Sequence, residues 1–329
     1  MRILVTGGAG YLGSVLIPEL LNKSHKVRIL DIGYFGFSHL KPFFSQLEII
    51  CEDIRKVYKD KQFREDLVNN CDCIIHLAAI SNDPSCKLSP KLTEEVNVKA
   101  TEALAEIAKI KKIKFIFSSS CSVYGRINGI AKEDYPLNPL SIYAESKLKA
   151  ENILNGLSDG DWRPIILRSA TLFGYSYRMR FDLVINIFSL YSTLYNKIRL
   201  FNQGKDFRPF IHVKDCARAF VYFLEKEELK YQCYNLAYKN MCIRDVADIF
   251  KKLNPSLEIL EENEGDLDNR DYRVSIERMR EEGFYPFIDI ETGAQEIMDA
   301  ITNGMIPEPE SIYYRNVEWL NYLIFNKNA

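Results

Sequence analysis

"TGGAGYLG", residues 6–13, places four glycines between a short apolar run and an amphipathic run. Gly8, Gly10 and Gly13 fit the pattern G-x-G-x-x-G, and Gly7, Gly10 and Gly13 fit G-x-x-G-x-x-G. Between a strand and a helix, such glycines permit a tight turn, a close approach of backbone to a pyrophosphate, and close helix packing. The helix that begins here offers free N–H groups to phosphates. This loop therefore predicts a dinucleotide-binding α/β fold.

The first half of the chain alternates short apolar runs with amphipathic helical stretches. Strands are predicted at residues 2–6, 26–31, 47–53, 73–79, 114–120 and 163–170. Helices are predicted at residues 11–23, 92–110 and 143–157. Such alternation implies right-handed crossovers and a parallel sheet, and fully apolar strands fit a sheet covered on both faces. The predicted fold class is α/β, a Rossmann-type doubly wound parallel sheet.

The second half has a looser rhythm and predicts a smaller lobe. Helical pieces are expected at 214–228 and 243–252, and the aromatic-rich tail 310–325 is expected to pack as a helix on the body or on a partner subunit. We predict a dinucleotide-binding domain over residues 1–172. A smaller C-terminal α/β substrate lobe over 173–329 is interleaved with it.

Composition excludes several classes of partner. The chain has 329 residues, is 47% hydrophobic and carries a net charge of −2 without a basic stripe, which argues against nucleic acid or a membrane surface. No apolar segment approaches the ~20 residues that span a bilayer, and the N-terminus lacks the apolar core of a secretion signal. The eight cysteines show no zinc-type spacing. We expect a cytoplasmic protein with reduced thiols and no metal.

The end of the second predicted strand indicates which dinucleotide is bound. Asp31 lies about 20 residues beyond the glycine loop, where a carboxylate accepts hydrogen bonds from the adenosine ribose 2′-OH. It would repel a 2′-phosphate, and no arginine follows it in "DIGYFG", so the sequence favours NAD over NADP. Asp53 and Ile54, at the end of the third strand, are expected to flank the adenine.

The motif "YAESK" places Tyr143 four residues before Lys147, on one face of a predicted helix. An ammonium beside a phenol favours the phenolate and lowers the pKa of the tyrosine, which can then exchange a proton with a sugar or alcohol oxygen. Three serines at 118–120 end the fifth strand, at the sheet edge where ligands of such folds bind. A second pair, Tyr222 and Lys226, has no such serine turn and is expected to be structural.

These motifs together resemble the extended short-chain dehydrogenases/reductases, in the nucleotide-sugar epimerase and dehydratase branch that includes the UDP-galactose 4-epimerases. The resemblance covers nearly the whole chain. The motifs that carry it are "TGGAGYLG", "LD" (30–31), "EDI" (52–54), "HLAA" (76–79), "NVKAT" (97–101), "SSSCSVYG", "YAESK", "LRSATLFG" (167–174) and "RPFIHVKDCARA" (208–219).

The resemblance implies a catalytic set of Ser120, Tyr143 and Lys147, with Ser118 or Ser119 as alternatives to Ser120. It implies that Asn97 supports the catalytic helix. The residues expected to bind the cofactor are Gly7, Gly10, Tyr11, Leu12, Gly13, Asp31, Asp53, Ile54, Leu77, Ala78, Ala79, Asn97, Ser118, Tyr143 and Lys147. The residues expected to bind a nucleotide-sugar are Ser120, Thr171, Arg180, Arg208 and Arg273.

Two departures from the family pattern concern the substrate. The epimerases have a Tyr-Phe-Asn run where this chain has "SAT" at 169–171, and Asn263 stands where they have a phosphate-binding arginine. Arg270, Arg273, Arg178 and Arg180 are candidates to replace that arginine, while Arg208 matches another phosphate-binding arginine and offers a fork suited to phosphate.

Three functions follow from the resemblance. The first is an NAD-dependent epimerase that acts at C4 of a nucleotide-sugar, and the second is a net C4 dehydrogenase or ketoreductase. The third is a non-catalytic dinucleotide sensor, which the Ser–Tyr–Lys set argues against. A 4,6-dehydratase is not expected, because Cys121 and Ser122 stand where the resembled dehydratases have carboxylates. Family members pair the helices at 92–110 and 143–157 across a dimer, so we expect a homodimer.

Overall fold

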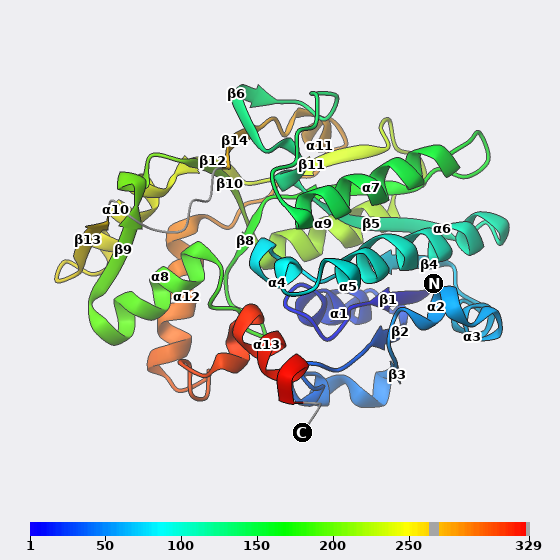
Figure 1. The fold of residues 1–329 in the computed structure, drawn as a ribbon, viewed down its shortest axis with the longest axis horizontal. Coiled ribbons are helices and arrows are strands. Elements are labelled where there is room, and N and C mark those ends of the chain that lie inside the picture. The colour runs from blue at the N-terminus through cyan, green and yellow to red at the C-terminus, as the bar shows by residue number, and fades with distance from the viewer. Residues whose placement is uncertain (263–269, 327–329) are drawn as a thin grey trace.

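The computed structural model describes residues 1–262 and 270–326 (Figure 1). A seven-stranded sheet with the order β11-β7-β5-β4-β1-β2-β3 forms the centre of the larger lobe. Its strands are β1 (Arg2–Thr6), β2 (Lys26–Asp31), β3 (Leu47–Cys51), β4 (Cys73–His76), β5 (Lys114–Ser120), β7 (Ile165–Ser169) and β11 (Cys233–Leu236). Every neighbouring pair is parallel, which confirms the predicted doubly wound sheet.

Helices cover both faces of this sheet because alternate residues of its strands point to opposite sides. In β1, Ile3 and Val5 join the core under α1 and α9, while Leu4 joins the core under α6 and α7. The helices of this lobe are α1 (Gly13–Asn22), η1 (Ser38–Gln46), α2 (Lys56–Lys59), α3 (Lys61–Leu67), α4 (Asp83–Leu88), α5 (Pro90–Glu94), η2 (Glu95–Lys99), α6 (Ala100–Ile110), η3 (Cys121–Tyr124), α7 (Ile142–Leu157) and α9 (Val213–Glu225).

The predicted helix at 92–110 is three pieces, because η2 is a π-type turn between α5 and α6. Asn97 lies in this turn. Its amide Nδ2 donates to Ile80 O at 3.1 Å and to Ser146 Oγ at 2.9 Å, and its Oδ1 accepts from Ile80 N at 2.8 Å. One extra residue in a helical turn is often found at a functional site, and here it ties the loop after β4 to α7.

The smaller lobe has three short sheets, with the orders β12-β10-β8, β13-β9 and β14-β6. Its elements are β6 (Arg126–Ala131), β8 (Thr171–Phe173), α8 (Val184–Tyr195), β9 (Lys197–Phe201), η4 (Asn202–Gly204), β10 (Phe207–His212), β12 (Lys239–Cys242), α10 (Ile243–Leu253), β13 (Glu258–Glu262), β14 (Asp271–Val274), α11 (Glu277–Glu281) and α12 (Ile290–Thr302). After residue 173 the chain returns to the larger lobe for α9 and β11. The division of the chain at residue 172 stays a prediction.

The tail forms η5 (Ile312–Tyr314) and α13 (Asn316–Asn326), the red helix in Figure 1, which contacts α4 of the larger lobe. It therefore packs on the body of its own chain. Within residues 1–262 and 270–326, no helix combines the length and apolar character that a membrane crossing needs.

Candidate functional site

A cavity of about 1140 Å³ runs along the carboxyl ends of the large sheet and continues against the smaller lobe. Gly7 follows β1, Asp31 ends β2, and Leu77 follows β4, and all three line it. Arg208 and Ile243 line it from the smaller lobe. The carboxyl ends of parallel strands are where ligands of doubly wound folds bind, so this cavity is the candidate site.

The glycine loop fits a dinucleotide because its backbone is packed so closely that a side chain at Gly7 or Gly13 would not fit. Gly7 has φ +72°, and a Cβ there would lie 2.7 Å from Ala78 N. A Cβ on Gly13 would lie 2.6 Å from Gly7 O. The first turn of α1 contains no acidic residue and has no side-chain cap, so its N–H groups and dipole favour a phosphate.

Asp31 is fixed at the same end of the cavity. Its carboxylate accepts hydrogen bonds from Ala9 N at 3.0 Å and from Gly33 N at 2.9 Å. Burial raises the pKa of Asp31, while these two hydrogen bonds lower it. The carboxylate of Asp53 is held by Arg55 at 2.6 Å, and Ile54 lines the cavity beside it.

Tyr143, Lys147 and Ser120 meet where β5 and α7 approach the cavity. Tyr143 and Ser120 share a side-chain hydrogen bond, and both line the cavity. Lys147 Nζ donates to Ser118 O at 2.8 Å and lies 5.8 Å from the centroid of the Tyr143 ring. The hydroxyl of Ser119 instead donates to Glu151. The geometry therefore favours Ser120 over its two neighbours as the partner of Tyr143.

The electrostatics of this set differ from the expectation that Lys147 lowers the pKa of Tyr143. Burial is the largest influence on Tyr143, and it raises the pKa of the phenol. Burial also lowers the pKa of Lys147 to about 8. The expectation is corrected because both side chains lose their water, which disfavours the charged form of each.

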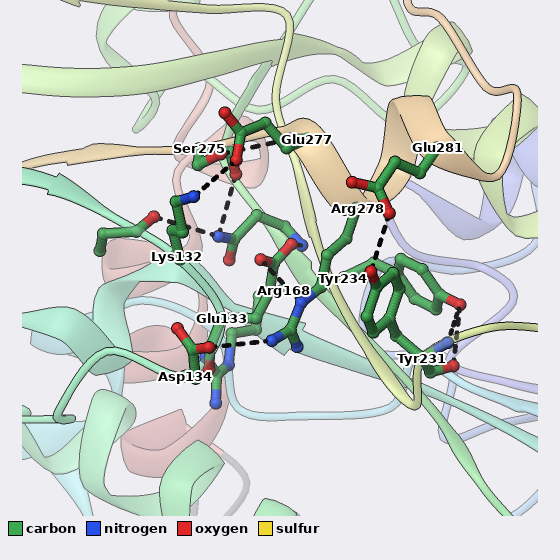
Figure 2. A network of polar contacts seen from close by, with 12 residues as sticks. Lys132, Glu133, Asp134, Arg168, Tyr231, Tyr234, Ser275, Glu277, Arg278 and Glu281 are labelled. Atoms are coloured by element: carbon green, nitrogen blue, oxygen red, sulfur yellow. Dashed lines mark hydrogen bonds and ion pairs between the residues drawn. The ribbon is translucent and has the colours of Figure 1, made fainter.

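A buried polar network supports the serine turn from behind. Arg168 in β7 binds Glu151 of α7 at 2.7 Å, the Tyr124 hydroxyl at 2.8 Å and Glu133 O at 2.9 Å. Figure 2 shows Arg168 and Glu133 beside Arg278 from α11. Glu151 lies one helical turn beyond Lys147 and accepts from Ser119, so this network fixes β5, β7 and α7 relative to one another.

The predicted residues lie at the cavity with two exceptions. All the predicted cofactor residues line it except Asn97, which is buried behind it. Of the predicted substrate residues, Ser120, Thr171, Arg180 and Arg208 line it. Arg273 is absent from the described lining, because its guanidinium stacks on Phe207 with 4.3 Å to the ring centroid. The role of Arg273 in binding the substrate stays a prediction.

Two other arginines have partners that bear on their predicted roles. Arg180 is buried and binds Asp182 through two hydrogen bonds, at 2.9 Å and 2.8 Å, so its charge is already neutralised. Arg270 lines the cavity and pairs with Asp83 at 3.2 Å. Asn263 lies outside the described residues.

Sequence reasoning missed other lining residues. Arg126 in β6 and Arg199 in β9 reach the cavity from edge strands of the smaller lobe. No motif marks either arginine, because their neighbours in the cavity are distant in sequence. Asp182 carries a detectable signal, since it follows Arg180 at a spacing that permits a local ion pair.

Comparison with known proteins agrees with this geometry. The chain is 30% identical over 253 residues to the uncharacterized UDP-glucose epimerase YtcB of Bacillus subtilis, covering 72% of this chain and 76% of that one. It is 29% identical over 249 residues to dTDP-D-glucose 4,6-dehydratase of Dictyostelium discoideum, covering 69% of this chain and 56% of that one.

A solved structure and a family model extend the comparison. The structure of UDP-glucuronic acid 4-epimerase from Bacillus cereus in complex with NAD has a TM-score of 0.79 and 25% identity, covering 92% of this chain and 99% of that one. The model for the NAD dependent epimerase/dehydratase family matches residues 3–237. The glycine loop and Asp31 fit NAD as the cofactor, and the chain belongs to the NAD dependent epimerase/dehydratase family.

Proposed function

We propose that this protein is an NAD-dependent epimerase that acts at C4 of a nucleotide-sugar. The observation that carries the proposal is the meeting of Ser120 and Tyr143 at the cavity, where Ser120 lowers the pKa of the Tyr143 phenol, with Lys147 beside them. A phenol, a hydroxyl and an ammonium in one place can bind a single alcohol oxygen and move its proton. The epimerases among the similar proteins support the same class of reaction.

The chain's own residues handle the proton and position the sugar. Tyr143 accepts the proton of the C4 hydroxyl and later returns it, and Ser120 hydrogen-bonds the same oxygen. With a pKa of about 8, Lys147 is largely protonated at neutral pH, while the charge of Arg180 and the Ser120 hydroxyl oppose the effect of burial on Tyr143. NAD, when bound, supplies reversible hydride transfer with the sugar carbon.

The remainder of the cavity is suited to a nucleoside diphosphate. Its volume of about 1140 Å³ exceeds the ~300–1,000 Å³ of a site for one drug-sized ligand, which leaves room for a second ligand beside the cofactor. Four arginines line it from β6, β9, β10 and the residue before β14. They are Arg126, Arg199, Arg208 and Arg270. Guanidinium forks bind phosphate oxygens in pairs, so this end of the cavity is proposed to hold the sugar-linked diphosphate.

The test is turnover of UDP-, GDP-, dTDP- and CDP-sugars without added NAD. We expect one substrate to change its configuration at C4 at constant mass, as followed by NMR of the product. Stoichiometric formation of NADH at 340 nm with a stable keto product would instead identify a net dehydrogenase. Absence of any reaction with protein shown to hold NAD would refute both.

A further inference from the structure

Arg178 is a buried cation that lacks an anionic partner among the described residues. Arg178 is 2% exposed, and its Nη2 donates a hydrogen bond to Oδ1 of the neutral Asn316 side chain at 2.6 Å. Its Nε has no hydrogen-bond partner in the described part of the chain. The guanidinium stacks on Phe35, with 3.4 Å to the ring centroid. The charges of Asp182 and Asp31 reach Arg178 only through space, without a direct ion pair among the described residues. Burying a charge is costly unless it is paired, so this arrangement favours a further anion in direct contact with Arg178.

Arg178 lies on the side of the cavity that holds the glycine loop. Its backbone N–H donates to Ser176 Oγ at 3.3 Å, and the Ser176 hydroxyl donates to Tyr11 O, in that loop, at 2.7 Å. Burial and the charge of Arg180 lower the pKa of Arg178 to about 9, although the charges of Asp182 and Asp31 oppose this, and the value is still above neutral pH. The backbone of Arg178 therefore lies beside the loop where α1 favours a pyrophosphate, and its charged guanidinium lies between Phe35 and Asn316 at the cavity wall.

The C-terminal strap, residues 311–324, holds Arg178 from outside. Besides accepting from Arg178, Asn316 donates through Nδ2 to Ser81 Oγ at 3.1 Å. Trp319 Nε1 donates to Tyr34 O at 2.7 Å, and the Tyr313 hydroxyl donates to Phe35 O. Each residue that the strap binds in this way lines the cofactor cavity. The strap thus joins the loop after β2 to the loop after β4, across the cavity wall.

Within the strap, α13 is fastened more by polar contacts than by apolar packing. A second cavity of about 150 Å³ lies beneath α13, lined by Tyr34, Leu92, Leu320 and Ile324 among others. Leu320, 7% exposed, is the one buried apolar residue among the described side chains of α13. An incompletely packed apolar face contributes less dispersion and burial than a filled one. Breaking the hydrogen bonds of Asn316 and Trp319 would therefore weaken the hold of α13 on the cavity wall.

We propose that the C-terminal strap retains NAD, with Arg178 binding the cofactor's pyrophosphate and Asn316 holding Arg178 in position. The pyrophosphate supplies the direct anionic contact that Arg178 lacks among the described residues, and bound NAD in turn stabilises the closed strap. Retention does not depend on which sugar is the substrate, so the inference stands apart from the proposed epimerisation. It suits a reaction in which the hydride returns to the substrate and the cofactor need not leave.

The first test is the dissociation rate of NAD from Asn316→Ala. Protein loaded with radiolabelled NAD is chased with excess unlabelled NAD, and retained label is followed by rapid filtration. The variant loses hydrogen bonds to Arg178 and Ser81, one of them charge-assisted, so release should be at least about tenfold faster. Asn321→Ala, at an exposed asparagine of the same helix, should release NAD at the wild-type rate. Wild-type release from a folded Asn316→Ala variant, as shown by its thermal melting, would overturn the proposal.

The second test separates recognition of the pyrophosphate from general stability. Arg178→Gln should weaken binding of NAD and of ADP-ribose by at least about tenfold, because both contain the pyrophosphate. Its affinity for adenosine, which has no phosphate, should stay within about twofold of wild type. Trp319→Phe keeps a ring but removes the N–H donor to Tyr34 O, so it should speed NAD release less than Asn316→Ala does. Equal weakening of adenosine and NAD in Arg178→Gln would show a structural role and overturn the assignment.

Discussion

Replacing Glu151 by glutamine removes the carboxylate that neutralises Arg168 inside the larger lobe. The side chains of the pair are 1% and 6% exposed, and three nitrogen–oxygen contacts of 3.0, 3.2 and 2.7 Å join them. Removing one partner of such a pair leaves an uncompensated buried charge and costs about 3–5 kcal/mol. Arg168 keeps its hydrogen bonds to Tyr124 and Glu133, so we expect Glu151→Gln to lose about 3 kcal/mol of unfolding free energy.

Equilibrium urea unfolding, followed by circular dichroism at pH 7, measures this loss. Glu94→Gln is the matched control, because Glu94 pairs with Lys149 at 2.9 Å where both side chains are largely exposed. Exposed pairs contribute about 0–1 kcal/mol, so the control should change little. The double variant Glu151→Met, Arg168→Met should regain much of the lost stability, since apolar replacement of a whole buried pair is often neutral.

The same variant should affect turnover more than substrate affinity. Glu151 accepts from Ser119, next to Ser120, and lies one turn beyond Lys147 on α7. We expect Glu151→Gln to lower kcat with little change in KM. A loss of stability below about 1 kcal/mol, equal to that of Glu94→Gln, would refute the role given to this buried pair.

Three further predictions test chemistry, pH dependence and assembly. Tyr143→Phe should lower turnover by ~10²–10⁴-fold with NAD binding retained, whereas Tyr222→Phe should keep the activity, as steady-state rates will show. Burial raises the pKa of Glu296, but hydrogen bonds from His212 and Lys214 outweigh this effect, and the net pKa is lowered to about 2. This lowered pKa stabilises the fold above the ordinary pKa, and the benefit is lost as pH falls toward 2. Glu296→Gln should therefore cost up to about 3 kcal/mol at pH 7 and almost nothing near pH 2, by urea unfolding. Light scattering at micromolar concentration should give a dimer mass for the pairing expected through α6 and α7, and a monomer mass would contradict it.

The sequence predicted the parts of the site that are local in the chain. The glycine loop, Asp31 and the Tyr143–Lys147 pair lie within single strand–helix junctions or single helical turns. Their spacing therefore carries the geometry, and the structure places each of them at the cavity. The six strands predicted for the large sheet are also present in the structure. Short apolar runs rich in β-forming residues indicate strands that are buried on both faces of a sheet.

The rest depends on contacts between distant segments. Arg178 and Asn316 are 138 residues apart, and neither has a neighbour in sequence that marks the contact. Arg273 resembled a phosphate ligand by its position near a family motif, but its side chain stacks on Phe207. The sequence predicted a regular helix at Asn97, where the structure has a π-type turn. One residue inserted into a helix hardly changes the spacing of its apolar residues, so the sequence pattern does not show it.

The last prediction concerns loss of water from the substrate. A 4,6-dehydratase must expel the C6 hydroxyl, and hydroxide leaves only when an acid protonates it. After Ser120 the turn offers Cys121, which is buried and donates to Arg168 O at 3.1 Å, so it faces away from the cavity. Asp182 does line the cavity. Although burial raises its pKa, the charge and hydrogen bonds of Arg180 lower it, so the carboxylate is ionised at neutral pH and cannot donate a proton.

The other carboxylates of the described lining lie away from Tyr143 in the fold. Asp31 ends β2, and Glu52 and Asp53 follow β3, at the end of the cavity where the adenosine is expected. Asp206 precedes β10 in the smaller lobe. None of the carboxylates in the described lining is therefore placed as a neutral acid beside Tyr143. We predict that any nucleotide-sugar turned over keeps its C6 hydroxyl, and that the product differs from the substrate in configuration or oxidation state at C4. Mass spectrometry of the product decides this, since a product lighter by one water would contradict the assignment of Asp182 as permanently ionised.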